Sequence, residues 1–130
     1  MKTLSKAAET VMAQAYAPYS NYLVGAAIRT VSGKIYAGCN VENAAYPLGN
    51  CAESSAIAAM IAGGEQEIAE VFVMTQGDKP GTPCGGCRQR LAEFAGPDVL
   101  VHCGLANGEL HTCTMAELLP HAFDLKEIIK

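Results

Sequence analysis

The chain has 130 residues, half of them apolar, with a formal net charge of −4 and a sequence pI of about 5.3. This length suits one domain with one hydrophobic core, and the apolar content excludes a disordered chain. A net negative charge does not suit a surface that neutralises the phosphates of a nucleic-acid polymer. We therefore expect residues 1–130 to form a single domain that acts on a small molecule.

The N-terminal segment and the cysteines indicate the compartment. Residues 1–6 lead into an Ala-rich amphipathic stretch and lack the continuous apolar run of a signal peptide. No window of the sequence is apolar enough for a membrane span. An apolar chain of this size without a secretion signal does not need disulfides, although six cysteines permit them. We expect a reducing cytoplasm, with Cys39, Cys103 and Cys113 as small buried apolar side chains.

Hydrophobic periodicity and turn residues divide the chain into alternating helices and strands. We expect, in chain order, a helix over residues 3–16, strands over 22–30 and 34–41, a helix over 51–61, a strand over 70–76, a helix over 84–95, strands over 99–103 and 109–113, and short helices over 114–119 and 124–130. Thr3 or Ser5 is placed to cap the first helix, and Thr114 and Glu117 have the spacing of a capping box.

This order of elements favours an α/β fold. The first two strands form a hairpin around Ser32, Gly33 and Lys34, and helices separate the later strands, which is typical of a mixed five-stranded sheet. Residues 70–76 are short and apolar, so we expect them at the centre of the sheet. Helices should cover both faces and make a three-layer α-β-α sandwich.

Three cysteines and one glutamate carry the strongest chemical signal. Cys51 and Glu53 belong to a Cys-Ala-Glu element, and Cys84 and Cys87 belong to a Pro-Cys-Gly-Gly-Cys element. Three thiolates can hold one Zn²⁺ ion and leave its fourth position open to water, whereas structural zinc sites are closed by a fourth protein ligand. Glu53 lies close enough in sequence to handle the protons of that water. The pattern predicts a hydrolytic site with one zinc ion per chain.

Both elements lie at the starts of expected helices. Cys84 and Cys87 share a helical face, whereas Cys51 and Glu53 are two residues apart and can share a site only beyond the helix start. The two helix N-termini should therefore meet at one point. Their partial positive charges would offset the net negative charge of zinc with three thiolates. We expect the same environment to lower the pKa of the thiols.

Other interpretations of the cysteines remain open. Cys84 and Cys87 alone have the spacing of a redox pair, and a fourth ligand from Cys39, Cys103 or Cys113 would close the zinc site. The combination of a ligand-x-Glu element with Pro-Cys-x-x-Cys is more specific than either part. This combination resembles the known zinc-binding pattern of nucleobase deaminases, including their three-cysteine version.

With these motifs in place, the sequence resembles the small, homotetrameric, zinc-dependent cytidine deaminases over nearly its whole length. Residues 19–27 resemble the family's first-strand motif, 38–46 its nucleoside loop and 118–123 its C-terminal segment, and the two cysteine elements resemble its zinc motifs. The resemblance implies a cytidine deaminase-like fold and hydrolytic deamination of cytidine, and of deoxycytidine, in pyrimidine salvage. It also implies a homotetramer whose pockets are completed by neighbouring subunits.

The resemblance implies a role for each matched residue. Zinc would be bound by Cys51, Cys84 and Cys87, and Glu53 would shuttle protons. Within the same chain, the nucleoside would be held by the ribose-binding side chains of Asn40 and Glu42, by Tyr22 against the pyrimidine and by the backbone of Ala52. A neighbouring subunit would complete the pocket with Ala44, Tyr46 and Phe123. Independently of the resemblance, Asn40 and Glu42 are two apart on an extended segment, so their side chains point the same way and suit ribose hydroxyls.

Two departures from the family pattern affect the site. The family usually carries an Arg after Cys-Ala-Glu, where it helps to neutralise the thiolates, but Ser54 stands here. We expect Arg88, next to Cys87, or the helix ends to do more of that work. Tyr22 and Leu23 also replace more usual residues, which affects substrate preference and leaves the reaction unchanged.

Two alternatives to a cytidine deaminase remain. The same chemistry could act on another free aminopyrimidine or amino-heterocyclic nucleoside. A non-catalytic zinc-stabilised binding module would instead use Glu53 only as an acid favoured at a helix N-terminus. A polymer-editing deaminase is disfavoured, because its basic grooves and stacking aromatic side chains do not fit a charge of −4 and 6% aromatic residues.

Overall fold

The computed structural model describes residues 1–126, and its elements follow the expected order. They are α1 (Lys2–Met12), β1 (Gly25–Thr30), β2 (Ile35–Cys39), the short 3-10 helix η1 (Tyr46–Leu48), α2 (Ala52–Ala62), β3 (Ile68–Met74), α3 (Gly85–Ala92), β4 (Leu100–Gly104), β5 (Leu110–Thr114) and α4 (Met115–Leu118). The expected last helix runs into residues 127–130, which lie outside the described residues. At its expected start, the Lys126 N–H donates to Asp124 Oδ1.

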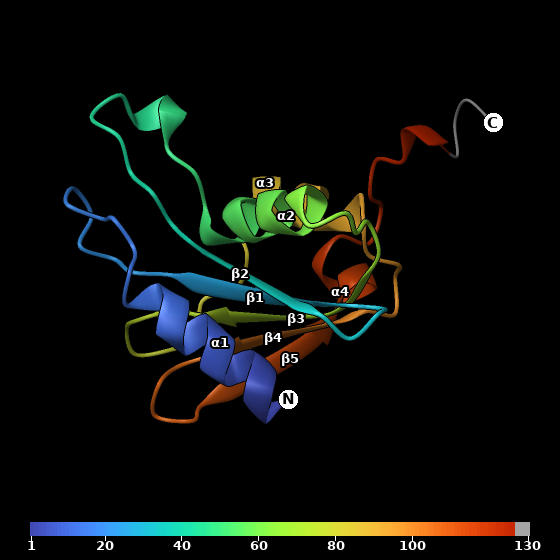
Figure 1. The fold of residues 1–130 in the computed structure, drawn as a ribbon, viewed down its shortest axis with the longest axis horizontal. Coiled ribbons are helices and arrows are strands. Elements are labelled where there is room, and N and C mark those ends of the chain that lie inside the picture. Colours follow the sequence, from blue (N-terminus) through green and yellow to red (C-terminus); the bar gives the residue numbers. More distant parts are fainter. Residues whose placement is uncertain (127–130) are drawn as a thin grey trace.

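The strands form one mixed sheet in the order β2-β1-β3-β4-β5. Among these five strands of residues 1–126, only the β3–β4 pair is parallel, and β3 lies at the centre as expected. Figure 1 shows α1 on one face of the sheet and α2, α3 and α4 on the other. The expected five-stranded, three-layer α/β architecture is confirmed.

Alternating residues of the strands build a core on each side of the sheet. Ala26 and Ile28 of β1 join the larger core cluster beneath α2 and α3, whereas Ala27 between them joins a smaller cluster with Leu4 and Ala8 of α1. This alternation is the two-residue period of a strand that is buried on both faces.

Two glycines let the helices lie close to the sheet. A Cβ on Gly25 of β1 would lie 2.1 Å from the Ala8 carbonyl oxygen of α1. A Cβ on Gly38 of β2 would lie 2.4 Å from the Ala56 backbone nitrogen of α2. Side chains at these positions would push the helices away. Gly38 therefore allows the close approach to the sheet of α2, the helix that begins at the Cys-Ala-Glu element.

The first helix is shorter than expected, and its expected cap is wrong. It ends at Met12, and its N-cap position is Met1. The Ser5 hydroxyl instead donates to the Lys2 carbonyl oxygen. The chain leaves the helix early because Tyr16 exchanges backbone hydrogen bonds with Asn40 and Glu42, which seats it beside the end of β2.

The N-terminal boundary of β1 also differs from the expectation, whereas the capping box of α4 is confirmed. The Leu23 and Val24 N–H groups donate to the side chains of Gln76 and Asn40, so regular strand pairing begins only at Gly25. At α4, the Glu117 N–H donates to the Thr114 hydroxyl, and the Thr114 N–H donates to the Glu117 carboxylate.

Candidate active site

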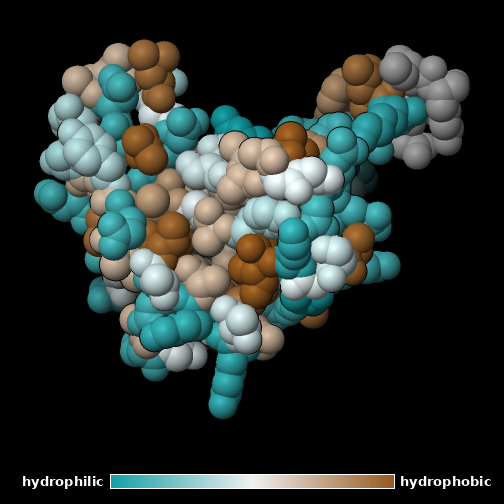
Figure 2. Space-filling model, viewed as in Figure 1, coloured by the Kyte–Doolittle hydropathy of each residue, from teal (hydrophilic) through white to brown (hydrophobic). Residues whose placement is uncertain are grey.

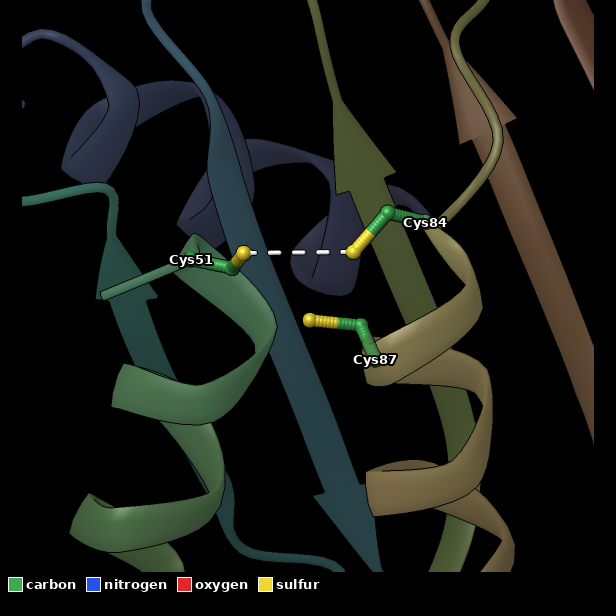
Figure 3. Close-up of side chains that lie close together, drawn as sticks. All are labelled: Cys51, Cys84 and Cys87. Atoms are coloured by element: carbon green, nitrogen blue, oxygen red, sulfur yellow. Dashed lines mark hydrogen bonds between the residues drawn. The ribbon is translucent and has the colours of Figure 1, made fainter. Parts of the chain in front are cut away.

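Three cysteine sulfurs gather where two helices begin. Cys51 is the N-cap residue of α2, Cys84 is the N-cap residue of α3, and Cys87 lies in the first turn of α3. Their Sγ atoms all lie within 4.8 Å of one another, and those of Cys51 and Cys84 are 4.0 Å apart. Figure 3 shows the three side chains pointing into the space between the two helix starts. The expected meeting of the helix N-termini is confirmed.

The sulfur cluster fits a zinc ion. Tetrahedral zinc with Zn–S bonds of about 2.3 Å holds its sulfur ligands roughly 3.8 Å apart, close to the separation of Cys51 and Cys84. Within residues 1–126, the group of side chains close enough to share a metal ion with these sulfurs consists of the three cysteines alone. Three protein ligands leave the fourth position for water or substrate, which is the arrangement of a catalytic zinc site.

The other three cysteines lie away from this cluster. Cys103 of β4 and Cys113 of β5 are buried in the larger core cluster, as expected, and Cys39 at the end of β2 is half-buried. All six cysteines are free thiols. The structure therefore gives no support to a zinc site closed by a fourth cysteine.

The expected lowering of all three thiol pKa values is wrong. Burial raises the pKa of Cys51 and of Cys87. Only the pKa of Cys84 is lowered, chiefly because the Cys87 backbone N–H donates to its sulfur. The partial charges of the helix starts act on all three sulfurs, but removal from water opposes them most strongly at Cys87, which is fully buried.

Glu53 lies in the first turn of α2, and only 5% of its surface is exposed. Burial raises the pKa of its carboxyl, while its own backbone N–H, the Cys87 thiol and the charge of Arg90 act in the opposite direction. A buried carboxyl beside a metal position is suited to exchange protons with groups bound there.

A pocket of about 370 Å³ opens above this cluster, a size that suits a small molecule. Cys51, Cys84 and Glu53 line it together with Thr75 and Thr82. Of the residues expected to hold a nucleoside, the pocket wall includes Tyr22, Asn40, Glu42, Tyr46 and Ala52.

The side chains of Asn40 and Glu42 also build the pocket wall. Asn40 accepts from the Val24 N–H at 2.9 Å and donates to the Tyr22 carbonyl oxygen at 2.8 Å. Glu42 accepts from the backbone N–H groups of Tyr19 and Ser20 and from the Ser20 hydroxyl, and this hydroxyl is the main cause that lowers the pKa of Glu42. Both side chains are therefore held in fixed positions before any ligand arrives.

Two of the residues expected from a neighbouring subunit, Ala44 and Phe123, do not line the pocket of their own chain. Residues 42–50 form an arm that projects from the body beside α2 (Figure 1), and Figure 2 shows apolar surface on it. Tyr46 on this arm is 74% exposed although its ring lies edge-on to Tyr19, with the centroids 5.8 Å apart. Phe123, beyond α4, is 61% exposed.

Of the two expected sources of neutralising charge, Arg88 or the helix ends, Arg88 makes no hydrogen bond to the sulfurs within residues 1–126. Its guanidinium donates to the carbonyl oxygens of Pro83 and Leu118, and so ties the segment before α3 to α4. Arg90 instead donates from Nη1 to Cys87 Sγ at 3.5 Å. Arg90 was not among the residues expected at the site, although its position three residues after Cys87 on a helix is a signal that points to it.

Comparison with known proteins decides the family. Residues 1–103 match the family model described as the cytidine and deoxycytidylate deaminase zinc-binding region. The chain belongs to this family. The cytidine deaminase of Sporosarcina psychrophila is 40% identical over 115 residues, which are 88% of this chain and 85% of the relative. That of Halalkalibacterium halodurans is 39% identical over 114 residues, or 88% of this chain and 86% of the relative.

A solved structure agrees with the sequence relatives. The crystal structure of cytidine deaminase from Burkholderia pseudomallei has a TM-score of 0.89 and 41% identity, and the match covers 94% of this chain and 98% of that one. The expected family, fold and zinc cofactor are therefore confirmed. None of the helices within residues 1–126 has the length and apolar character that crossing a lipid bilayer requires.

Proposed function

We propose that this member of the family hydrolyses cytidine, and also deoxycytidine, to the uracil nucleoside and ammonia. The observation that carries the proposal is the open three-sulfur cluster with buried Glu53 beside it, at the base of a pocket that fits a small molecule. Relatives that align over most of the chain are named cytidine deaminases. A zinc-stabilised binding module would not need an open metal position or a buried acid.

In this proposal Cys51, Cys84 and Cys87 hold the zinc. When bound, the metal acts as a Lewis acid and lowers the pKa of water from 15.7 to about 7. Glu53 accepts a proton from the attacking water and delivers it to ring N3, which makes C4 a better electrophile. Glu53 also moves the proton that turns the amino group into ammonia. Its burial beside the cluster keeps the carboxyl within reach of these positions.

The rest of the pocket would hold the nucleoside. Asn40 and Glu42 would bind the ribose hydroxyls with the donor and acceptor capacity left over from their contacts with residues 19–24. Tyr22 would pack against the pyrimidine, and the backbone of Ala52 at the start of α2 would contact the base. All four residues line the same pocket.

We further propose a homotetramer in which Ala44, Tyr46 and Phe123 complete a neighbour's pocket. The support is the resemblance to homotetrameric deaminases and the exposure of large apolar side chains, Tyr46 and Leu48 on the projecting arm and Phe123 beyond α4. Free thiols and a thiolate-rich metal site suit a reducing cytoplasm, where the enzyme would serve pyrimidine salvage.

A mixing experiment tests the shared pocket. A Glu53→Gln chain keeps Phe123 but lacks the proton shuttle, and a Phe123→Ala chain keeps Glu53 but lacks the neighbour's aromatic ring. Subunit exchange between two weakly active homo-oligomers should raise activity above the sum of the parents, because some mixed pockets contain both intact residues. Activity equal to that sum, with exchange shown by native mass spectrometry, would contradict the proposal.

The reaction itself is tested with a substrate panel. Purified protein should convert cytidine and deoxycytidine and release one ammonia per product formed. Turnover of another amino-heterocyclic nucleoside but not of cytidine would favour the first alternative. Zinc binding without turnover of any substrate would favour the non-catalytic module.

A further inference from the structure

The sulfur cluster presents a charge problem once it holds zinc. Three thiolates around a divalent ion leave one net negative charge in a partly buried site, and such a charge needs a nearby cation or hydrogen-bond donors. The helix starts supply partial charges only. In the part of the chain that the structure describes, the cationic group that hydrogen-bonds a cluster sulfur is the guanidinium of Arg90, 3.5 Å from Cys87 Sγ.

The path of the Arg90 side chain supports this contact. Arg90 lies one turn after Cys87 on α3, and its side chain runs back toward the helix start, as helical side chains do. A Cβ on Gly86 would lie 3.2 Å from Arg90 Nη1. The missing side chain at Gly86 therefore leaves room for the guanidinium beside the first turn of α3.

Neither neighbouring candidate makes such a contact. The Arg88 guanidinium is occupied by the carbonyl oxygens of Pro83 and Leu118. The Ser54 hydroxyl donates to the Cys51 carbonyl oxygen and carries no charge. The full positive charge that contacts the cluster therefore comes from Arg90 on α3 and not from a residue at position 54 on α2.

A shallow cavity of about 390 Å³ connects the two helices at this point. Ser54 of α2 and Arg90 of α3 both line it, with Ile57 and Phe94 farther along. Because the two positions line the same space, a long cationic side chain at position 54 has room in the cavity that Arg90 also lines.

We propose that Arg90 is a positioning residue. Its charge neutralises the Cys87 thiolate and sets the zinc affinity, because Ser54 on the other helix provides no cation. This inference rests on the proposed function, because it takes Cys51, Cys84 and Cys87 as zinc ligands. Arg90 does not line the substrate pocket, so its effect acts through the ligand sulfur.

The test measures zinc affinity by competition with a chromophoric chelator at fixed pH. Arg90→Gln removes the charge and should weaken zinc binding by about 10- to 100-fold, the usual effect of removing a partner of a metal ligand. Arg90→Lys keeps the charge and should lose less. Lys6→Gln is the matched control, since it removes an exposed cation from α1 on the opposite face of the sheet.

A rescue experiment separates charge from packing. Ser54→Arg in the Arg90→Gln background should recover most of the lost affinity, because it returns a guanidinium to the shared cavity. The thermal midpoint of the zinc-free protein should be the same in Arg90→Gln and Lys6→Gln, since the Arg90 side chain is exposed. A lower zinc-free midpoint without a change in affinity would assign Arg90 a structural role and overturn the inference.

The outcomes distinguish this inference from the proposed function. Zinc bound equally well by the parent, by Arg90→Gln and by Lys6→Gln would overturn the role of Arg90 and leave the deaminase proposal intact. A folded parent protein that binds no zinc at Cys51, Cys84 and Cys87 would overturn both.

Discussion

Cys51 Sγ and Cys84 Sγ lie 4.0 Å apart although 33 positions separate the residues in sequence. Each is the N-cap residue of its helix, and both helices pack on the same face of the sheet. The sheet therefore brings together two helix starts, and the metal position lies where their unpaired N–H groups and partial positive charges meet.

Removal of one sulfur should release the metal and weaken the fold. Cys84→Ala leaves two sulfur ligands, so we expect zinc to be lost and the thermal midpoint to fall, because metal binding is coupled to folding. Metal analysis and thermal unfolding measure both effects. Cys39→Ala removes a thiol outside the cluster and should keep its zinc. Full zinc occupancy in a folded Cys84→Ala protein would contradict the ligand assignment.

The role of Glu53 separates chemistry from metal binding. Glu53→Gln keeps the shape of the side chain but cannot carry the proton, so kcat should fall by at least about 10²- to 10⁴-fold while zinc remains bound. Steady-state kinetics and metal analysis on the same sample measure the two effects. Glu67→Gln changes an exposed acid away from the site and should leave kcat unchanged. Near-normal turnover in Glu53→Gln would exclude the proton shuttle.

Glu42 should affect substrate binding more than chemistry. Glu42→Ala removes a charged acceptor from the pocket wall, and KM for cytidine should rise by about 10- to 100-fold, the value of one or more hydrogen bonds to a charged group. Ser20→Ala is the control, because it removes a donor to Glu42 but keeps the carboxylate. An equal rise of KM in both variants would show that Glu42 acts only by holding residues 19–20.

Glu70 provides a pH-dependent part of the stability at a distance from the site. Its carboxylate accepts from Arg29 and lies at hydrogen-bond distance from His102 Nε2, while His102 Nδ1 lies 2.8 Å from the Thr112 hydroxyl. The Arg29 hydrogen bond, with help from His102, holds the pKa of Glu70 below its ordinary value. Since the pKa of Glu70 is lower in the folded than in the unfolded protein, this stabilisation is present at neutral pH. It is lost as the pH falls from about 4.3 through the folded-state pKa.

The corresponding variant is Glu70→Gln. Its free energy of unfolding at neutral pH should be lower by about 0.5 to 1 kcal/mol, because the Arg29 side chain is 38% exposed and water weakens the ion pair. The difference from the parent should shrink as the pH falls through the titration of Glu70. Urea unfolding of the zinc-free proteins over a pH series measures this difference without the effect of metal loss. A difference that stays constant down to the acid range would contradict the ionic role of Glu70.

Much of the site could be predicted because helix starts have local signals. The spacing of Cys84 and Cys87 after Pro83, and the position of Cys51 before an Ala-rich run, fixed where each sulfur lies on its helix. The meeting of the helices that begin at Cys51 and Cys84 could be predicted because three thiolates must lie close together to bind one zinc ion. The central position of residues 70–76 followed from their short apolar run.

The rest depended on contacts that distant segments make in three dimensions. Which arginine reaches the sulfurs depends on whether a carbonyl group occupies its guanidinium, and Arg88 is bound by Leu118, 30 residues away. The thiol pKa values depend on burial, which opposes the visible effect of the helix ends. The end of α1 depends on the pairing of Tyr16 with residues 40–42.

The most direct test of the account counts zinc and measures cytidine turnover in one preparation. We expect one zinc ion per 13.6 kDa chain, loss of turnover when a chelator removes the metal, and recovery when zinc is returned. Turnover that persists at full rate in the zinc-free protein, or zinc-loaded protein that leaves cytidine unchanged, would contradict the account.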